Sequence, residues 1–359
     1  MMAPSPRCLP GSKTHDLPSF KRLAAFSSWV TLTLESKSAI SSSTPLSHSS
    51  SLALAYLRGP PDLIEYIISS EYATLKFLEG TSVPAPQAFG YALASDPGNL
   101  VGVTYLLIQA LPGKPYYEYL ATPEQTARVM EQFADIMIEL GKHPLGDIGS
   151  LTPLKKREGL AVGPLASNRF LHLDHTLGAF STAAEYYASV AQAYLDILAG
   201  SQLVQSDAEA ARQFYEAVRD NASIIATLLS EFELFFLKHV DDKGDHLLVD
   251  EDYNIVGIID WQFARVVPAA EAFGPSLLTA DMGILYAGAE SGGPTAGDKI
   301  LADALRKKEG SECHRTRYLA RVMAGYMEAG SSGNGGNNLM RRIQFGIPAG
   351  SSAEETKQP

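Results

Sequence analysis

The sequence predicts an α+β fold in which a small β-rich lobe precedes a larger, mostly helical lobe. Strand-like runs gather before residue 112, at 52–58, 84–91 and 103–111. Beyond that point apolar residues recur at helical spacing, with one short hairpin at 247–259 as the exception. Leu111-Pro112-Gly113 separates the two patterns, and because Pro and Gly break regular structure, it predicts a hinge between the lobes.

Composition restricts the class of protein. The chain has 359 residues, of which 45% are hydrophobic, so we expect about two domains. Cys8 and Cys313 are too few for a disulfide framework and indicate a reducing compartment, so we expect a cytoplasmic protein. No uncharged apolar run reaches the length of a membrane span. The Ser-rich, acid-poor residues 1–60 leave a mitochondrial transit segment as an alternative.

Charge is distributed unevenly along the chain. Residues 1–60 hold six Lys or Arg and two acidic residues, a net charge of +4, so the rest carries −11 − 4 = −15. An acidic body of this kind argues against nucleic acid as a partner and favours neutral or cationic small substrates. The oligomeric state is not predicted.

The expected small lobe begins with a strand at 52–58, after a Pro- and Ser-rich tail at 1–51 that shows no periodicity. Pro60-Pro61-Asp62 and Gly80 are typical of the beginning and end of a helix. The apolar stripe of this helix comprises Ile64, Ile67, Ile68, Leu75 and Leu78. Glu71 falls on the same stripe, so we expect its carboxylate to face the interior.

The large lobe is expected to begin with a helix at Thr122-Pro123-Glu124-Gln125. One or two further helices are predicted over Asp207–Lys238, with a break near Asn221. A hairpin follows at 247–259, then a helical tail to about residue 343 with a flexible Gly-rich loop at 330–336. The last residues, 346–359, are expected to be disordered.

Two carboxylates flank the predicted hairpin. Asp241 lies in the loop before it, and Asp260 ends its second strand, nineteen residues later. Phosphoryl transfer requires that the acceptor hydroxyl is positioned and that a metal ion and cationic groups bind the triphosphate. Asp241 is suited to accept the proton of the acceptor hydroxyl. Lys243 is close enough in the loop to contact the transferred phosphoryl group. Asp260 is suited to bind Mg²⁺ through a carboxylate oxygen. The alternative is that both carboxylates only cap turns.

The run His239–His246 resembles the catalytic loop H-x-D-x-x-x-x-N of protein kinases and of the aminoglycoside phosphotransferase/choline kinase family. Leu248–Trp261, which ends I-I-D-W instead of D-F-G, is similar to the aminoglycoside phosphotransferase branch. Three further segments resemble the small-lobe helix, the following strand and the hinge of its fungal members: Ser70–Leu75, Thr81–Pro86 and Leu111–Pro115. The resemblance covers roughly residues 60–290.

The resemblance implies a bilobal protein kinase-like fold, with a small lobe over 52–111 and a helical large lobe over 112–345. It further implies that ATP and Mg²⁺ are cofactors and that the γ-phosphoryl group passes to a hydroxyl of a small molecule. By the same resemblance Asp241 is the catalytic base and Asp260 the main metal ligand.

The resemblance also gives roles to residues of the small lobe. Glu71 takes the place of the acidic partner of a nucleotide-binding lysine. The backbone of Gln109-Ala110-Leu111 takes the place of the hinge that faces adenine. Arg58, thirteen residues before Glu71, is the nearest candidate for the cation that binds the phosphates.

Two departures from the family pattern favour an alternative function. His246 replaces the asparagine, and imidazole is a poorer Mg²⁺ ligand than an amide oxygen; His246 could equally be a metal ligand, a loop hydrogen-bonding residue or a surface residue. Before residue 60 the only glycines are Gly11 and Gly59, so a glycine-containing phosphate loop and a strand-borne lysine are missing. The small lobe is therefore expected to be incomplete, and the alternative is a catalytically impaired, kinase-shaped (pseudokinase) binding protein.

Overall fold

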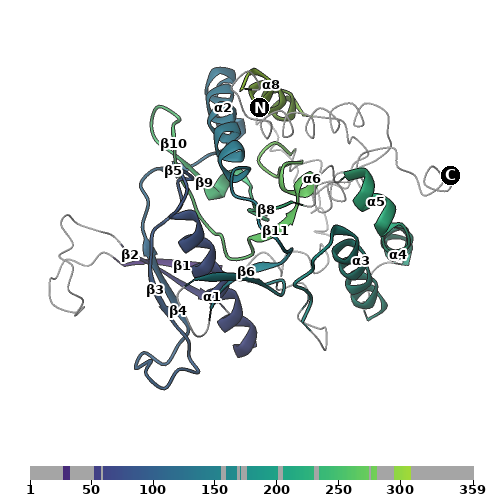
Figure 1. Cartoon of the computed structure of the whole chain (residues 1–359). Helices are drawn as coiled ribbons and strands as arrows, with labels where there is room; N and C mark the ends of the chain where they lie inside the picture. The colour runs from purple at the N-terminus through teal and green to yellow at the C-terminus, as the bar shows by residue number, and fades with distance from the viewer. Residues whose placement is uncertain are drawn as a thin grey trace, which may run out of the picture.

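The structure, a computed structural model, describes residues 27–32, 52–57, 60–154, 159–167, 170, 176–200, 205–229, 234–274, 276–280 and 295–308. The chain forms two lobes, with a sheet and one long helix on one side and a group of helices on the other (Figure 1). The predicted α+β, bilobal architecture is confirmed. None of the described helices is long and apolar enough to cross a membrane.

The small lobe is built on a four-stranded antiparallel sheet of order β1-β2-β4-β3. The strands are β1 (Ser27–Leu32), β2 (Leu52–Leu57), β3 (Ala88–Ala92) and β4 (Tyr105–Gln109). The last three confirm the strands expected from the sequence. Strand β1 lies inside the segment that composition predicted to be a tail, and it pairs with β2 from Ser27↔Leu57 to Leu32↔Leu52. An incomplete small lobe stays a prediction, because residues 33–51 lie outside the described part.

Helix α1 (Pro61–Leu78) lies between β2 and β3 in the chain and confirms the predicted helix. Pro61 occupies its first turn, where the missing N–H costs no hydrogen bond. The expected stripe is buried at Ile67, Ile68, Leu75 and Leu78. This face packs on β3 and β4 and on β6 (Ser150–Pro153) of the large lobe, so α1 connects the two lobes.

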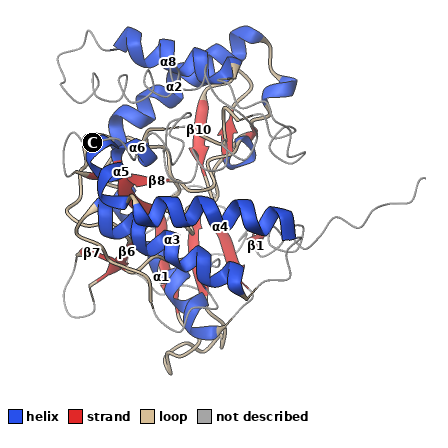
Figure 2. Cartoon of the chain, turned by 90° about the vertical axis from the view of Figure 1, so that its right-hand side faces the viewer, coloured by secondary structure: helices blue, strands red, loops and turns tan. Residues whose placement is uncertain are grey.

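The large lobe contains two groups of helices. Helix α2 (Pro123–Leu140) begins with a capping box formed by Thr122 and Gln125, and it packs on α8 (Ala296–Lys308). Helices α3 (Ala183–Ala199), α4 (Gln205–Asp220) and α5 (Ala222–Leu229) form the second group, in which α3 and α4 lie side by side (Figure 2). The predicted break at Asn221 is confirmed. The predicted helical tail is confirmed over α8, and its Gly-rich loop lies outside the described residues.

The prediction that helix continues to Lys238 is wrong. Phe235–Lys238 form strand β8, which pairs with β11 (Arg265–Pro268), and the short helix α6 (Ala269–Ala272) follows β11. All four residues of β8 are buried. A short run that is buried on both faces has no periodicity that distinguishes a strand from a helix, so the sequence pattern could not decide between them.

The remaining strands are short and lie where the lobes meet. Strands β9 (Leu247–Val249) and β10 (Ile255–Ile258) form the predicted hairpin, and β5 (Lys114–Pro115) extends it in the order β10-β9-β5. Strand β6 pairs with β7 (Leu160–Gly163). Single turns of 3₁₀ helix lie at Glu118–Leu120 and Gly244–His246. The backbone N–H of Ile258 donates to the Pro84 carbonyl at 2.7 Å, which ties the hairpin to the small lobe.

Gly113, in the predicted hinge, lies in close contact with this hairpin. Its φ is +105°, and a methyl group added there would lie 2.9 Å from the Val249 carbonyl oxygen and 2.7 Å from Val256 Cγ2. Only glycine combines this backbone conformation with such a close approach.

Gly113→Ala is therefore expected to lower the free energy of unfolding by about 2–4 kcal/mol, from left-handed backbone strain plus overpacking. Gly102→Ala is the matched control, because φ is +77° there but no atom lies within 4 Å of the added methyl. Chemical denaturation of both variants separates the two contributions. Equal decreases in the free energy of unfolding of the two variants would show that the contacts with Val249 and Val256 do not contribute to the effect.

Candidate active site

The loop between β8 and β9 carries Asp241, Lys243 and His246, and hydrogen bonds fix its position. His239 Nε2 donates to the Ile259 carbonyl at 2.9 Å, which joins the beginning of the loop to the end of β10. Asp242 Oδ1 accepts from the Leu277 backbone N–H at 2.9 Å. Burial lowers the pKa of His239, which keeps its imidazole neutral.

Three side chains of the predicted site meet at this loop. Asp241, His246 and Asp260 each offer a ligand atom within 4.8 Å of the other two. His246 Nδ1 lies 2.8 Å from the Asp241 backbone oxygen, and His246 Nε2 lies 3.3 Å from Asp260 Oδ2. Among the described residues, this is the group of His and acidic side chains placed to hold a metal ion. The fold thus brings together the two carboxylates that the sequence separates by nineteen positions.

The two carboxylates differ in their access to solvent. The Asp241 side chain is 41% exposed, whereas the Asp260 side chain is 9% exposed. Gln262 Nε2 donates to Asp260 Oδ1 at 2.7 Å and leaves Oδ2 directed to His246. Asp260 also has φ of +66°, an uncommon conformation for a residue with a side chain and one that persists where surrounding structure enforces it. Asp241 is therefore accessible to an incoming molecule, and Asp260 is held in place.

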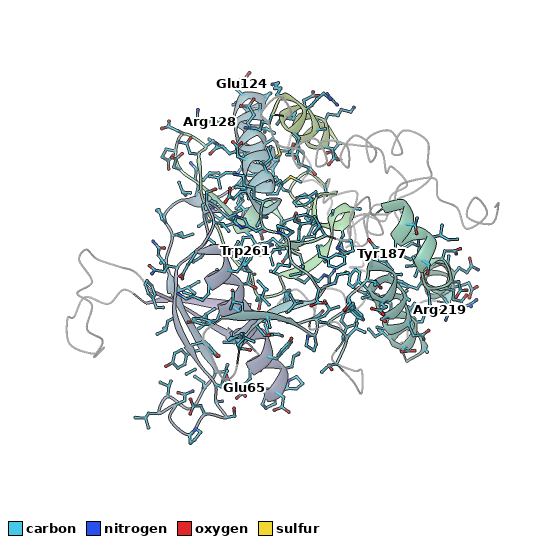
Figure 3. The ribbon with its side chains drawn as sticks, in the orientation of Figure 1. Glu65, Glu124, Arg128, Tyr187, Arg219 and Trp261 are labelled. Carbon is cyan, nitrogen blue, oxygen red and sulfur yellow. The ribbon has the colours of Figure 1, made fainter. Side chains whose placement is uncertain are left out.

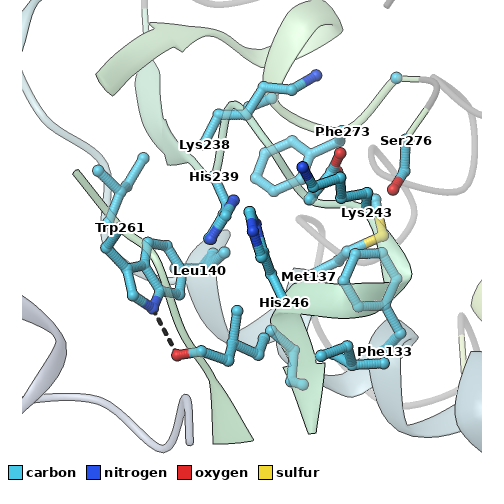
Figure 4. Close-up of a pocket in the computed structure, with 17 residues that line it drawn as sticks. Phe133, Met137, Leu140, Lys238, His239, Lys243, His246, Trp261, Phe273 and Ser276 are labelled. Carbon is cyan, nitrogen blue, oxygen red and sulfur yellow. Dashed lines mark hydrogen bonds between the residues drawn. The ribbon is translucent and has the colours of Figure 1, made fainter. Parts of the chain in front are cut away.

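Trp261 fixes the backbone next to Asp260. Its side chain is 1% exposed, and its Nε1–H donates to the Ile258 carbonyl at 2.8 Å (Figure 4). The indole packs edge-on against the His239 imidazole, with ring centroids 4.6 Å apart. Figure 3 shows Trp261 near the centre of the molecule. One aromatic residue therefore supports both the end of β10 and the loop between β8 and β9.

Lys243 is the cation nearest to Asp241. Its Nζ lies 3.2 Å from Asp241 Oδ2 and 3.8 Å from Asp245 Oδ2, and its side chain is 30% exposed. A partly exposed ammonium group at this position can move toward an anionic group that approaches Asp241. The location agrees with the role expected for Lys243, which stays a prediction.

A cavity of about 40 Å³ lies between the loop and α2. Figure 4 shows the imidazoles of His239 and His246 side by side, with Trp261 and Leu140 to their left and Met137 and Phe133 to their right. Small-molecule sites commonly enclose about 300 Å³ or more. The cavity is therefore large enough for water and too small for a nucleotide, so we assign it no substrate.

Glu71 lies on α1 with only 2% of its surface exposed. Burial raises the pKa of its carboxyl group well above the usual value, and the negative charge of Asp260 raises it further. Within the described part of the chain, neither an ion pair nor a hydrogen bond involves this carboxylate. Arg58, the cation that the sequence suggested as its partner, lies outside the described residues. Glu71 is thus near Asp260 and faces the interior, as expected.

We expect Glu71→Gln to stabilise the protein above pH 7. Because the pKa of Glu71 is raised in the folded state, that state binds the proton more tightly than the unfolded chain does, and stability falls as pH rises above 4.5. The gain should therefore increase as the pH is raised from 5 to 8, because the buried carboxyl group is progressively more costly to keep in the folded state. Denaturation at several pH values measures it.

Glu131→Gln is the control, because this exposed carboxylate lies 3.6 Å from Lys307 and such surface pairs contribute little. A Glu71→Gln variant that is less stable and also loses nucleotide affinity would contradict the prediction. That result would show that a cation outside the described residues pairs with Glu71.

Gln109 and Leu111 lie at the end of β4, where the hinge was expected. The Gln109 backbone N–H already donates to the Gln87 carbonyl at 2.8 Å. Leu111 packs against Gly257 of β10, where an added methyl would lie 2.5 Å from Leu111 Cδ1. This segment therefore runs beside the strand that leads to Asp260. Its expected contact with adenine stays a prediction.

The sequence did not identify several residues that support the loop. Gln262 positions Asp260, and Asp242 holds Leu277. Lys238, buried in β8, donates to the Glu271 backbone carbonyl at 2.6 Å, and burial lowers its pKa. The only available signal was a charged residue at the end of an apolar run, which is too common to indicate a role.

A second group of buried polar side chains is centred on Glu271, the hydrogen-bond partner of Lys238. The Glu271 carboxylate accepts hydrogen bonds from Tyr186 Oη at 2.9 Å and from Arg265 at 3.1 Å. All three side chains are nearly or fully enclosed in the large lobe. Because a buried charge is costly without a partner, this network fixes the region around α6 on which the loop rests.

The donor atoms at the Asp241–His246–Asp260 cluster fit Mg²⁺ only in part. Magnesium prefers octahedral oxygen ligands, which the two carboxylates supply. Imidazole nitrogen suits zinc and other transition ions better. The cluster therefore accommodates a divalent cation, but its third group does not match magnesium.

Residues 67–284 match the model of the phosphotransferase enzyme family (APH). The chain belongs to this family. The match begins within α1, after β2, and it includes the loop between β8 and β9 and the hairpin that ends at Asp260. The predicted kinase-like fold and the phosphotransferase resemblance are thereby confirmed. Among curated proteins, none matches the sequence.

Solved aminoglycoside phosphotransferases resemble the chain in structure at low sequence identity. A gentamicin complex of APH(2″)-IIa shares 11% identity over 85% of this chain and 89% of the other, with a TM-score of 0.45. An apo thermostable mutant of APH(4)-Ia shares 12% identity over 91% and 93%, with a TM-score of 0.45. A GDP complex of aminoglycoside 2′-phosphotransferase-IIIa shares 14% identity over 92% and 91%, with a TM-score of 0.38.

Proposed function

We propose that this protein transfers the γ-phosphoryl group of ATP to a hydroxyl group of a small molecule. The observation that carries the proposal is the meeting of accessible Asp241 and enclosed Asp260 within one cluster. Phosphoryl transfer requires one carboxylate at the acceptor and another at the metal-bound phosphates. Membership of the phosphotransferase enzyme family supports the same reaction.

Each residue of the site has a defined role in this reaction. Asp241 accepts the proton of the acceptor hydroxyl as the oxygen attacks the γ-phosphorus. Lys243, 3.2 Å from Asp241, stabilises negative charge on the transferred group. Asp260 would hold a divalent cation, which would supply positive charge to the nucleotide phosphates. The rigid support from Gln262 and Trp261 keeps Asp260 in place without rearrangement during the reaction.

The nucleotide is expected to lie between the lobes. The backbone of residues 109–111 faces the adenine, and Glu71 orients a cation on the phosphates, for which Arg58 is the candidate. Support comes from the location of Leu111 against β10 and from the electrostatic coupling of Glu71 to Asp260. Solved relatives in complex with ATP analogues or GDP show nucleotide binding for those proteins.

The acceptor is proposed to be neutral or cationic. Residues 61–359 carry a net charge of −15, from −11 for the chain and +4 for residues 1–60. Asp245 and Asp242 lie on the same loop as the catalytic Asp241, so the local charge is also acidic. Such a field attracts cations and repels acidic substrates. Amino sugars and amino alcohols are the substrate class that fits.

A kinase-shaped binding protein without activity is the second candidate. Strand β2 reads Leu-Ala-Leu-Ala-Tyr-Leu and has no cationic residue, and His246 replaces an oxygen ligand. Loss of cationic stabilisation removes the term that usually dominates the rate. Family membership favours transfer over this alternative.

Product analysis by mass spectrometry tests the two candidates. The purified full chain is incubated with ATP, Mg²⁺ or Mn²⁺, and separate panels of amino sugars, amino alcohols, neutral sugars and hydroxy acids. We expect one phosphoryl group on a neutral or amino-containing acceptor, with stoichiometric ADP. ATP binding without any phosphorylated product would support the inactive alternative. Failure to bind any nucleotide would overturn both.

A further inference from the structure

The tautomer of His246 is determined by its neighbour. The backbone oxygen of Asp241 can only accept, so His246 Nδ1, 2.8 Å away, must carry the hydrogen. In the neutral ring, Nε2 then holds a lone pair that faces Asp260 Oδ2 at 3.3 Å. Two acceptor atoms at this distance repel each other unless a proton or a metal ion lies between them. The pair is therefore suited to bind a cation.

Hydrogen bonds from surrounding groups hold both atoms in this orientation. The Nδ1–H bond to a backbone carbonyl fixes the imidazole plane, and Gln262 holds the other oxygen of Asp260 at 2.7 Å. Histidine ligands of metals usually donate their second N–H to a carbonyl or carboxylate, which fixes the tautomer and raises ligand basicity. The supporting contacts of a metal site are thus already in place.

The spacing of the two atoms fits a transition-metal ion. Metal–ligand bonds of about 2.1 Å at tetrahedral angles place two ligand atoms about 3.4 Å apart. The observed separation of Nε2 and Oδ2 is 3.3 Å. Asp241, whose ligand atom lies within 4.8 Å of both, is close enough to provide the third ligand when no acceptor hydroxyl occupies the site. Three protein ligands leave positions open for phosphate oxygens or water.

Unbalanced charge nearby favours a cation at the same place. Glu71 is 2% exposed, has no partner within the described residues and is electrostatically coupled to Asp260. An unpaired buried carboxylate is costly. A divalent ion between Asp260 and His246 would lower this cost, since it opposes the negative charge of both carboxylates.

We propose that His246, Asp260 and Asp241 form a binding site that prefers first-row transition-metal ions to Mg²⁺. Affinity should rise from Mn²⁺ through Co²⁺ and stay high for Zn²⁺, because a site with an imidazole ligand follows this general order. The inference deepens the proposed function and rests on it for the reaction that the ion serves. Binding of the ion is independent of that reaction.

Calorimetric titration of the full chain with each ion, without nucleotide and without a histidine tag, measures the preference. We expect Co²⁺ and Zn²⁺ to bind at least about tenfold more tightly than Mg²⁺. His246→Asn, which restores an amide oxygen, should weaken Co²⁺ binding at least about tenfold and strengthen Mg²⁺ binding. His143→Asn is the matched control, because His143 contacts Glu139 on α2 and has no part in the cluster.

Visible absorption of bound Co²⁺ and electron spin-echo spectra of bound Mn²⁺ report imidazole coordination in the unaltered chain, so the test survives a variant that does not fold. Absence of a nitrogen signal, Co²⁺ affinity no greater than that for Mg²⁺, or Co²⁺ affinity unchanged in a folded His246→Asn variant would each overturn the proposal. Because no nucleotide or acceptor is present, these outcomes are independent of the phosphotransfer assay, and either proposal can fail alone.

Discussion

Asp241→Asn is expected to lower kcat by about 10²-fold to 10⁴-fold, the usual contribution of a general base. The amide keeps the shape of the side chain and the backbone oxygen that holds His246, but it cannot accept the hydroxyl proton. Affinity for nucleotide should change little, since Asp241 faces the acceptor in the proposed reaction. Steady-state kinetics with the acceptor found by product analysis, together with nucleotide titration, measure both quantities.

Asp252→Asn provides the control for this variant. Asp252 is exposed at the turn of the β9–β10 hairpin, on the same structural unit but away from the cluster. Its substitution removes one negative charge without removing the proposed base. Equal rates for Asp241→Asn and the unaltered chain would exclude Asp241 as the base. A similar loss in both variants would indicate a general effect of charge.

Asp260→Ala is expected to abolish the dependence of nucleotide binding on divalent cations. Its carboxylate is 9% exposed, is fixed by Gln262 and supplies one of the two carboxylate groups of the cluster. Hydrogen bonds and contacts to charged groups contribute about 1.5–3 kcal/mol, so affinity for the cation–nucleotide complex should fall at least about tenfold. Titration with ATP in the presence and absence of the cation measures this difference.

Asp260→Asn distinguishes loss of charge from loss of structure. Asparagine tolerates the φ of +66° better than alanine does and can still interact with Gln262. The Asn variant should therefore be more stable than the Ala variant while losing most of the cation dependence. If either folded variant still bound the nucleotide in a cation-dependent way, the assignment of Asp260 would be wrong.

The site was predicted in part because its chemistry depends on local sequence. Asp241, Lys243 and His246 lie within six residues, and loop and strand-end positions follow from the flanking apolar runs. The meeting of His246 with Asp260 could also be expected, since a hairpin returns the chain to the beginning of its first strand. Gln262 and Asp242 were not identified, because their partners depend on how the chain turns after β10.

The sequence predicted the secondary structure correctly where the local residue pattern is compatible with only one type of element. Helix α1, the capping box of α2 and the β9–β10 hairpin all follow from local signals in the sequence. Strand β8 did not, because a four-residue run buried on both faces satisfies either structure, and its pairing with β11 decides the outcome. Strand β1 was missed because its pairing partner, β2, is about twenty-five residues away and local composition resembles a tail.

The sequence by itself determined the family and the two lobes, because these follow from local periodicity and from short motifs, and it indicated the candidate residues of the reaction. Only the tertiary structure decided which atoms of the cluster face each other. It showed that the Asp241 carbonyl fixes the His246 tautomer and that Nε2 faces Asp260. The orientation of the His246 imidazole depends on hydrogen bonds between a loop and a strand, and these cannot be read from the spacing of residues in the sequence. The histidine at position 246, where the family pattern has asparagine, thus gains a specific chemical meaning from the fold.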